Sequence, residues 1–230
     1  MSPAVSLTFE FIDGATRRTE PVTIRQAVVA GWTGRDKAAM EHHIVEVEAI
    51  GVKRPSKTPL FYRVGTQRLT TASSIEALGD DSSGEVEFVL VRVGGRLWVG
   101  AGSDHTDRKV ESSSIPVAKQ MCDKPVAPTL WTFESVVDHW DELVLRSWIY
   151  ENGQKVVYQE GTTAGLLRPE VLMKQFAGGE LAEGTLMFGG TLAAKGGIRP
   201  SGKFEFEIAD EKNGRRIAHG YEIVTLPIVE

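Results

Sequence analysis

Three acidic residues that are close in the sequence have the types and spacing to bind a metal ion. Glu85 and Glu87 are separated by one residue at the start of the apolar segment 85–93, and Asp104 follows a Gly-Gly turn and a second apolar segment. Successive side chains of a strand point to opposite faces, so the two glutamates would share one face. A hairpin through the two glycines would bring Asp104 back beside them.

The residues that follow the glutamates predict that their face becomes buried. Val89 and Val91 lie on the same face as the glutamates and are apolar, so this face is expected to enter a core. The alternative is that the glutamates lie on the solvent face of an edge strand. Two carboxylates beside a core repel each other unless a cation lies between them. Because carboxylate oxygens are preferred ligands of hard divalent cations, we expect Mg²⁺, or Mn²⁺ or Ca²⁺, at Glu85, Glu87 and Asp104.

Strand patterns dominate the rest of the chain. The predicted strands or strand pairs lie at 5–12, 22–32, 85–93, 96–104, 142–161, 184–193 and 203–224. The predicted helices lie at 35–51, 115–121 and 168–177. Asn-Gly pairs at 152–153 and 213–214 predict two further hairpin turns. The fold class is therefore α+β and mostly β, and residues 1–230 show no repeat or linker that would divide them into domains.

Composition limits the class of protein and its partners. The chain has 230 residues, 41% of them hydrophobic, and a net charge of −5 with no basic block, so nucleic acid is not an expected partner. A single cysteine, Cys122, excludes an internal disulfide, suits a reducing compartment and is expected to be structural. No apolar run approaches the roughly 20 residues that span a bilayer, and the N-terminus lacks a signal-peptide pattern. We expect a cytoplasmic protein with no membrane partner.

An ordered series of motifs resembles the fumarylacetoacetate hydrolase superfamily. The metal site of that family is an E-x-E on one strand and an Asp after the following hairpin, which matches Glu85, Glu87 and Asp104. The other matching segments are GWTGRDK at 31–37, TPLFYRV at 58–64, DHTDR at 104–108, AKQMCDKPVAPTLW at 118–131, DELVLRSWIYENG at 141–153 and EGTLMFGGTLA at 183–193.

The resemblance covers residues 27–222, with 1–26 as an N-terminal strand extension. It implies a mixed β-sheet roll like the C-terminal catalytic domain of fumarylacetoacetate hydrolase, with a Mg²⁺-type site over the roll. It also implies a homodimer. The substrate would be a 2-oxo acid or β-dicarbonyl compound whose enolate the metal stabilises.

By the same resemblance, several residues acquire expected roles. Lys119 and Arg108 would neutralise carboxylate or oxyanion charge. Thr191 would offer its hydroxyl to a substrate carboxylate. Asp107 stands where the family has a small residue before the arginine, and it is also expected to contact the substrate. The implied reaction is hydrolysis of a C–C bond next to the carbonyl. The alternatives are a decarboxylase, tautomerase or hydratase of the same fold, a non-catalytic metal-dependent dicarboxylate binder, and a metal-free relic of the fold.

The sequence departs from the family at one position that matters for hydrolysis. The histidine that ends the first motif is Lys37 here. Lys37 would act as an acid or an electrostatic anchor, or His43 or His42 would act as the base, or no water is activated. A histidine packed in the core is the alternative role for His43. His105 follows Asp104 directly, and it could ligate the metal, relay a proton or serve only the structure.

Three further residues are expected near the substrate if the resemblance holds. Arg35 is placed to meet a substrate carboxylate, although a surface arginine at a helix start would show the same pattern. Tyr62 and Arg63 belong to a polar cluster that leads into a strand and would line the pocket, unless that cluster is simply a solvated loop.

Overall fold

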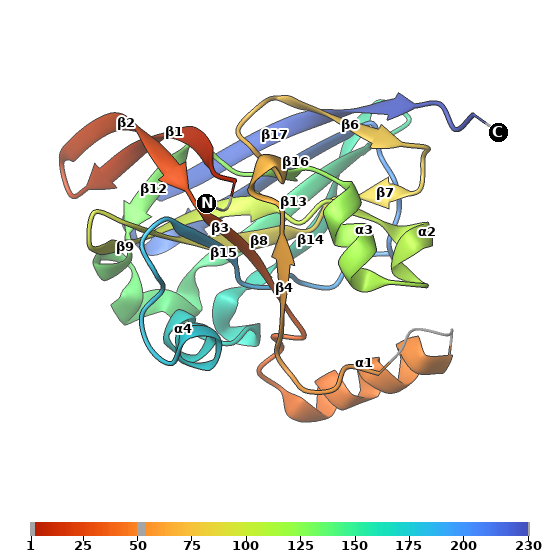
Figure 1. Cartoon of the computed structure of the whole chain (residues 1–230), viewed down its shortest axis with the longest axis horizontal. Helices are drawn as coiled ribbons and strands as arrows, with labels where there is room; N and C mark the ends of the chain where they lie inside the picture. Colours follow the sequence, from red (N-terminus) through yellow and green to blue (C-terminus); the bar gives the residue numbers. More distant parts are fainter. Residues whose placement is uncertain (1–2, 50–53, 230) are drawn as a thin grey trace.

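Eight strands form a mixed sheet that carries the acidic residues (Figure 1). The structure is a computed structural model, and it describes residues 3–49 and 54–229. In spatial order the strands are β2 (Thr16–Ile24), β1 (Val5–Asp13), β12 (Thr129–Thr132), β9 (Arg96–Ser103), β8 (Val86–Val93), β15 (Thr185–Phe188), β3 (Gln26–Gly31) and β4 (Leu60–Val64). The pairs β1–β12 and β15–β3 are parallel and the other pairs are antiparallel.

The eight-stranded sheet curls around a core that its own strands supply. Phe9 and Phe11 of β1 share one buried cluster with Val89 and Val91 of β8 and with Trp98 of β9. β1 is separated from β9 by β12 in the sheet order, yet the ring centres of Phe11 and Trp98 lie 4.6 Å apart, as a bent sheet allows. The fold is thus mostly β, with a mixed and curled sheet, as the sequence predicts.

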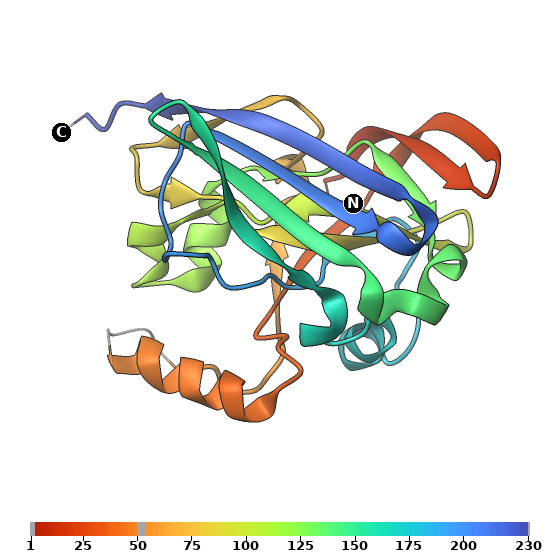
Figure 2. The same cartoon turned by 180° about the vertical axis from the view of Figure 1, so that it is seen from behind.

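A five-stranded sheet packs against the other face of the curled sheet (Figure 2). Its strands, in order, are β14 (Gln154–Thr162), β13 (Val144–Glu151), β16 (Lys203–Asp210), β17 (Arg215–Leu226) and β6 (Ser74–Leu78). Phe88 and Leu90 of β8 lie in the same buried cluster as Phe206 and Ile208 of β16. Since β8 is covered on both faces, its four residues from Phe88 to Val91 are all apolar and fully buried.

The hairpins follow from residues that accept a positive φ angle. Gly94 and Gly95 join β8 to β9 with φ of 62° and 70°, and Asn152 and Gly153 join β13 to β14 with φ of 51° and 78°. Two successive positive φ angles are typical of the tight turn that matches the twist of a hairpin. Gly214, with φ of 61°, ends the turn between β16 and β17. All three predicted hairpins are confirmed.

Four α-helices complete the described chain, with short connecting pieces. They are α1 (Lys37–Ala49), α2 (Arg108–Glu111), α3 (Ile115–Met121) and α4 (Pro169–Ala177). Short 3₁₀ helices lie at Thr66–Arg68, Phe133–Ser135, Val137–Glu142, Thr163–Gly165 and Glu211–Asn213. The three predicted helices are confirmed, and α1 lies below the two sheets in both views (Figures 1 and 2). None of these helices is long and apolar enough to cross a membrane.

Two small strand pairs fix the segments around the acidic residues. β7 (Ser82–Ser83) pairs with β10 (Thr106–Asp107), and β5 (Leu69–Thr70) pairs with β11 (Lys124–Pro125). The segment DDSSGE at 80–85 predicts a loop, and β7, which lies within it, corrects that prediction. A second correction concerns 22–32, where one strand was expected: the chain leaves β2 at Arg25 and enters β3 elsewhere in the sheet. The amide of Arg25 instead donates to the carbonyl of Gly184 at 2.8 Å.

Candidate metal centre

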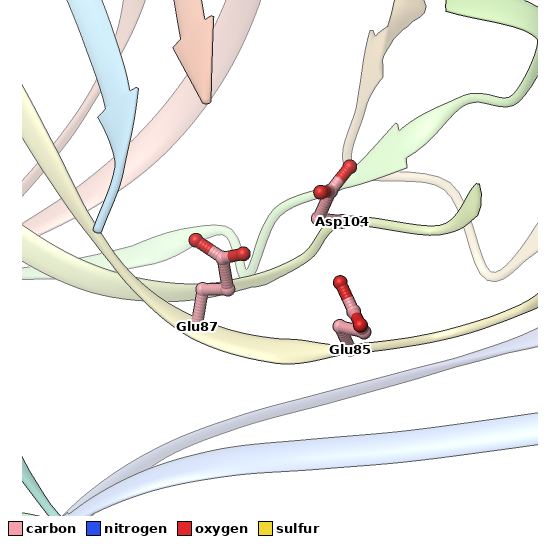
Figure 3. Close-up of side chains that lie close together, drawn as sticks. All are labelled: Glu85, Glu87 and Asp104. Carbon is pink, nitrogen blue, oxygen red and sulfur yellow. The ribbon is translucent and has the colours of Figure 1, made fainter. Parts of the chain in front are cut away.

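The hairpin of β8 and β9 brings the three predicted acidic ligands together. Glu85 directly precedes β8, Glu87 lies on it, and Asp104 directly follows β9 (Figure 3). The amide of Asp104 donates to the carbonyl of Glu85 at 3.0 Å, which extends the pairing one step beyond the strands. One carboxylate oxygen from each residue lies within 4.8 Å of the other two. The strand period and the Gly-Gly turn therefore placed this cluster correctly.

The cluster lies in the interior of the protein. Glu87 is 2% exposed and Asp104 is fully buried, while Glu85 is partly buried. Val89 and Val91, the next residues on the glutamate face, are fully buried, which confirms that this face enters a core. Carboxylates in such a place need hydrogen bonds and opposite charges.

Asp104 receives two lysines, one on each oxygen. The ammonium group of Lys119 contacts Oδ2, and that of Lys124 lies 3.2 Å from Oδ1. Burial alone would raise the pKa of Asp104, but the positive charges of Lys119 and Lys124 lower it to about 2. Burial alone would lower the pKa of Lys119, and the charges of Asp104 and Glu85 raise it above its usual value. Asp104 and Lys119 are therefore a charged pair.

Arg108 forms the corresponding ion pair with Glu85. Its Nη1 lies 3.2 Å from Oε1 of Glu85 and 2.8 Å from Oε2 of Glu111, and its Nε donates to the hydroxyl of Ser83 at 2.7 Å. Burial raises the pKa of Glu85, and the charge of Arg108 opposes that rise. Arg108 reaches this place because α2 starts directly after β10, where Asp107 caps the helix by accepting from the amide of Val110 at 2.8 Å.

Glu87 is hydrogen bonded to a backbone amide rather than to a cation. Its Oε2 accepts a hydrogen bond from the amide of Gly190 at 2.6 Å. Burial and the nearby charge of Asp104 raise the pKa of Glu87 well above its usual value. Without a metal, Glu87 therefore holds its proton more strongly than an ordinary glutamate does.

These residues fit a hard divalent cation. Opposite oxygens around Mg²⁺ lie about 4.2 Å apart, and those around Ca²⁺ about 4.8 Å apart. One oxygen from each of the three carboxylates lies within 4.8 Å of the other two, so the cluster is compact enough for such an ion. All three donors are carboxylates, as these ions prefer. The raised pKa of Glu87 shows that an additional positive charge beside it would stabilise its ionised form. The donor set, its spacing and its electrostatics thus agree.

Comparison with known proteins places the chain in a family. The model of a family described as "Protein of unknown function (DUF2848)" matches residues 30–221. The chain belongs to this family. No curated protein matches the sequence.

Solved structures show the fold of this DUF2848 protein. A "putative fumarylpyruvate hydrolase" from Burkholderia cenocepacia is 18% identical with a TM-score of 0.60, covering 99% of this chain and 98% of that one. A 2-keto-3-deoxy-D-arabinonate dehydratase complexed with magnesium and 2,5-dioxopentanoate is 15% identical with a TM-score of 0.61, covering 88% and 74%. A 5-carboxymethyl-2-hydroxymuconate delta-isomerase from Mycobacterium smegmatis is 17% identical with a TM-score of 0.59, covering 93% and 82%. The fold is that of the fumarylacetoacetate hydrolase superfamily.

Of the predicted substrate residues of the DUF2848 chain, Tyr62 lies beside Lys119. The Nζ of Lys119 is 5.9 Å from the centre of its ring, and its hydroxyl accepts from Nε1 of Trp32 at 3.2 Å. Thr191 follows Gly190, and its hydroxyl donates to the carbonyl of Val86 at 2.8 Å. That hydroxyl also accepts a hydrogen bond from Nε2 of Gln159 at 2.8 Å, so it both donates and accepts within the protein. Its predicted role toward substrate stays a prediction.

Other predicted residues are not brought to the cluster. Arg35 forms a two-pronged pair with Asp141, at 2.7 and 2.9 Å, and also donates to a backbone carbonyl. Arg63 is exposed and follows Tyr62 on β4, so it points to the opposite face of that strand. Lys37 is exposed at the first residue of α1. His43 lies in α1, and its side chain is outside the described part of the structure.

His105 has a structural set of partners. One ring nitrogen, Nδ1, lies 2.9 Å from the hydroxyl of Tyr221, and Nε2 lies 2.9 Å from the hydroxyl of Ser82. Burial lowers its pKa to about 3, which keeps the ring neutral. Because both nitrogens are engaged, His105 is placed neither to ligate the metal nor to accept a proton from water.

Sequence reasoning missed two contributors to the site. Lys124 lies in the segment 118–131 that matches the family, where the sequence predicted a role only for Lys119. Gly190 supplies the amide that meets Glu87, and a Cβ built on it would overlap the hydroxyl of Thr33. The second glycine of the Gly-Gly pair before Thr191 was the available signal.

Proposed function

We propose that this protein is a divalent-metal-dependent enzyme that forms the enolate of a 2-oxo acid or β-dicarbonyl substrate. The observation that carries the proposal is the convergence of Glu85, Glu87 and Asp104 within 4.8 Å in a buried, lysine-lined place. The dehydratase with the same fold is complexed with magnesium and 2,5-dioxopentanoate. That complex supports the choice of ion and of substrate class.

The charges around the cluster suit an anionic substrate. Four carboxyl groups and three basic groups belong to it, namely Glu85, Glu87, Asp104, Glu111, Arg108, Lys119 and Lys124. With all of them ionised, they leave one net negative charge, which a divalent cation would change to one net positive charge. A bound cation would also draw electrons from the carbonyl oxygens of the substrate and so lower the energy of its enolate.

Of the two lysines that contact Asp104, Lys119 is the one that a substrate would reach. Its side chain keeps 8% exposure, whereas that of Lys124 has none, so Lys119 is the nearer of the two to solvent. An ammonium group has three N–H donors, and the contact with Asp104 uses one of them. We propose that Lys119 donates to a substrate carboxylate or to the developing oxyanion, with the ring of Tyr62 beside it.

The type of reaction divides into two candidates. The resemblance to C–C bond hydrolases places hydrolysis first, but that reaction needs a base that activates water. His105 is engaged at both nitrogens and Lys37 is exposed on α1. These observations favour the second candidate, a decarboxylase or tautomerase, which needs only the enolate and a proton donor.

The first experiment is thermal unfolding of the metal-stripped protein. We expect Mn²⁺ to raise the melting temperature, and oxalate, an enolate mimic, to raise it further only when Mn²⁺ is present. A ligand at one hundred times its dissociation constant adds about 2.7 kcal/mol of stability. Glu85→Gln should lose both shifts, whereas Glu170→Gln, an exposed carboxylate on α4, should keep them. Absence of both shifts in the native protein would overturn the proposal.

Turnover assays then separate the reactions. Proton NMR in D₂O would detect metal-dependent deuterium exchange at C3 of 2-oxo acids, which any enolate-forming enzyme of this kind should catalyse. Release of pyruvate from an acylpyruvate indicates hydrolysis, and release of CO₂ from oxaloacetate indicates decarboxylation. Binding of Mn²⁺ and oxalate without exchange on any of these compounds would instead indicate a non-catalytic dicarboxylate binder. Light scattering tests the homodimer that we also propose.

A further inference from the structure

Lys124 is a charged side chain held entirely inside the protein. It is fully buried, and its Nζ lies 3.2 Å from Oδ1 of Asp104 and 3.2 Å from the carbonyl oxygen of Cys122. It also donates to the carbonyl oxygen of His105. Three oxygen atoms thus surround its nitrogen, which matches the three N–H donors of an ammonium group. A neutral amine would turn its lone pair toward one of these oxygens.

The position of Lys124 differs from that of Lys119 in its freedom to move. Both contact Asp104, on different oxygens, so each oxygen of that carboxylate already faces a positive charge. Lys119 keeps some exposure and can turn toward a substrate. Lys124 begins β11, which pairs with β5, and its two backbone carbonyl partners hold its ammonium group in place.

This arrangement opposes the binding of a cation by itself. A divalent ion that takes Asp104 as a ligand must share it with a fixed positive charge, in an interior where water does not screen the repulsion. An anionic ligand that enters with the ion would supply the missing negative charge. Metal and anion would then each strengthen the binding of the other, because such coupling is reciprocal.

We propose that Lys124 is a positioning residue that fixes Asp104 and makes retention of the metal depend on an anionic ligand. The inference rests on the proposed metal-dependent function and adds a binding order to it. The protein would bind a free divalent cation weakly and would hold it firmly only together with a 2-oxo acid or a similar anion.

The test measures Mn²⁺ binding through the electron paramagnetic resonance signal of free Mn²⁺, with and without oxalate. In the native protein, oxalate should tighten Mn²⁺ binding by about fivefold or more, the lower end of usual couplings between ligands. Lys124→Met should bind Mn²⁺ alone about fivefold more tightly, and its response to oxalate should shrink. Lys124→Gln keeps hydrogen-bond donors without the charge and should behave like Lys124→Met. Lys195→Met removes a lysine that is 52% exposed and should change neither value.

Each outcome decides the matter. No Mn²⁺ binding by the native protein would overturn the proposed function together with this inference. Mn²⁺ binding that oxalate does not tighten, or unchanged or weaker Mn²⁺ binding in folded Lys124 variants, would overturn the inference alone. Circular dichroism and gel filtration show whether the two variants fold. If neither folds, Lys124 is required for folding, and the inference is overturned as well.

Discussion

Two of the proposed metal ligands should respond in opposite ways when they are neutralised without metal. Asp104→Asn leaves Lys119 and Lys124 buried without their counter-charge. The pKa of Asp104, about 2 against a usual 3.8, means that its ionised form stabilises the folded protein. Stranding buried charges typically costs about 3–5 kcal/mol. At about 2–4 °C per kcal/mol for a chain of this size, the melting temperature should fall by about 6–20 °C.

Glu87→Gln should not destabilise the metal-free protein. The pKa of Glu87 is raised by burial and by the charge of Asp104, so its ionised form is unfavourable in the folded state. Glutamine has the same shape, carries no charge and still offers an oxygen to the amide of Gly190. We therefore expect an unchanged or higher melting temperature. Both substitutions should abolish the stabilisation by Mn²⁺, because each removes a ligand.

The assay is thermal and urea unfolding at pH 7 in the presence of EDTA, repeated with Mn²⁺. Gel filtration and circular dichroism establish that each variant folds. Equal losses of stability for Asp104→Asn and Glu87→Gln in EDTA would refute the reasoning from buried charge. A loss below about 1 kcal/mol for Asp104→Asn would refute it as well, because the lysines would then be stable without their partner.

Three further outcomes follow from the same contacts. Because the pKa of Glu87 is raised, the metal-free protein should lose stability as the pH rises from about 4.5 toward that pKa. Mn²⁺ binding displaces the proton of Glu87, so calorimetric titrations should show tighter binding over the same pH range. Gly190→Ala should lower the free energy of unfolding in urea by about 2–4 kcal/mol and weaken Mn²⁺ binding, because φ is 106° and the new Cβ would overlap Thr33. The control Gly153→Ala, with φ of 78° in open space, should lower it by about 1 kcal/mol and leave Mn²⁺ binding unchanged. Arg35→Ala should cost less than about 1 kcal/mol and leave binding of Mn²⁺ with oxalate unchanged, since its carboxylate partner is a surface group; a loss of oxalate binding would restore its predicted role.

The acidic cluster could be predicted because it depends on local rules. Strand alternation puts Glu85 and Glu87 on one face, and the two glycines of the turn fix where Asp104 returns. The same alternation could have separated Tyr62 from Arg63, because neighbours on a strand cannot face one pocket. Charged residues in a loop-like segment suggested a shared surface, and the strand register of β4 shows that they are on opposite sides.

The parts that could not be predicted depend on contacts between distant segments. Lys124 reaches Asp104 only because β11 pairs in parallel with β5, and no local period announces that pairing. The break at Arg25 has the same origin, because the amide of that residue finds Gly184, which is far along the chain. Pattern reasoning on a single sequence detects faces and turns, whereas these contacts join segments that are far apart in the sequence.

The buried charges also explain how the fold keeps three carboxylates together before any metal binds. Glu85 is paired with Arg108, and Asp104 is paired with two lysines, so only Glu87 depends on a proton in place of a positive charge. A cation that enters would therefore compete with a proton on Glu87 and would not have to organise the site. The reason for the extra lysine is then not stability, since one lysine already balances Asp104. A second fixed positive charge is useful where the ligand that must be retained is an anion, and this is the property that the proposed chemistry requires.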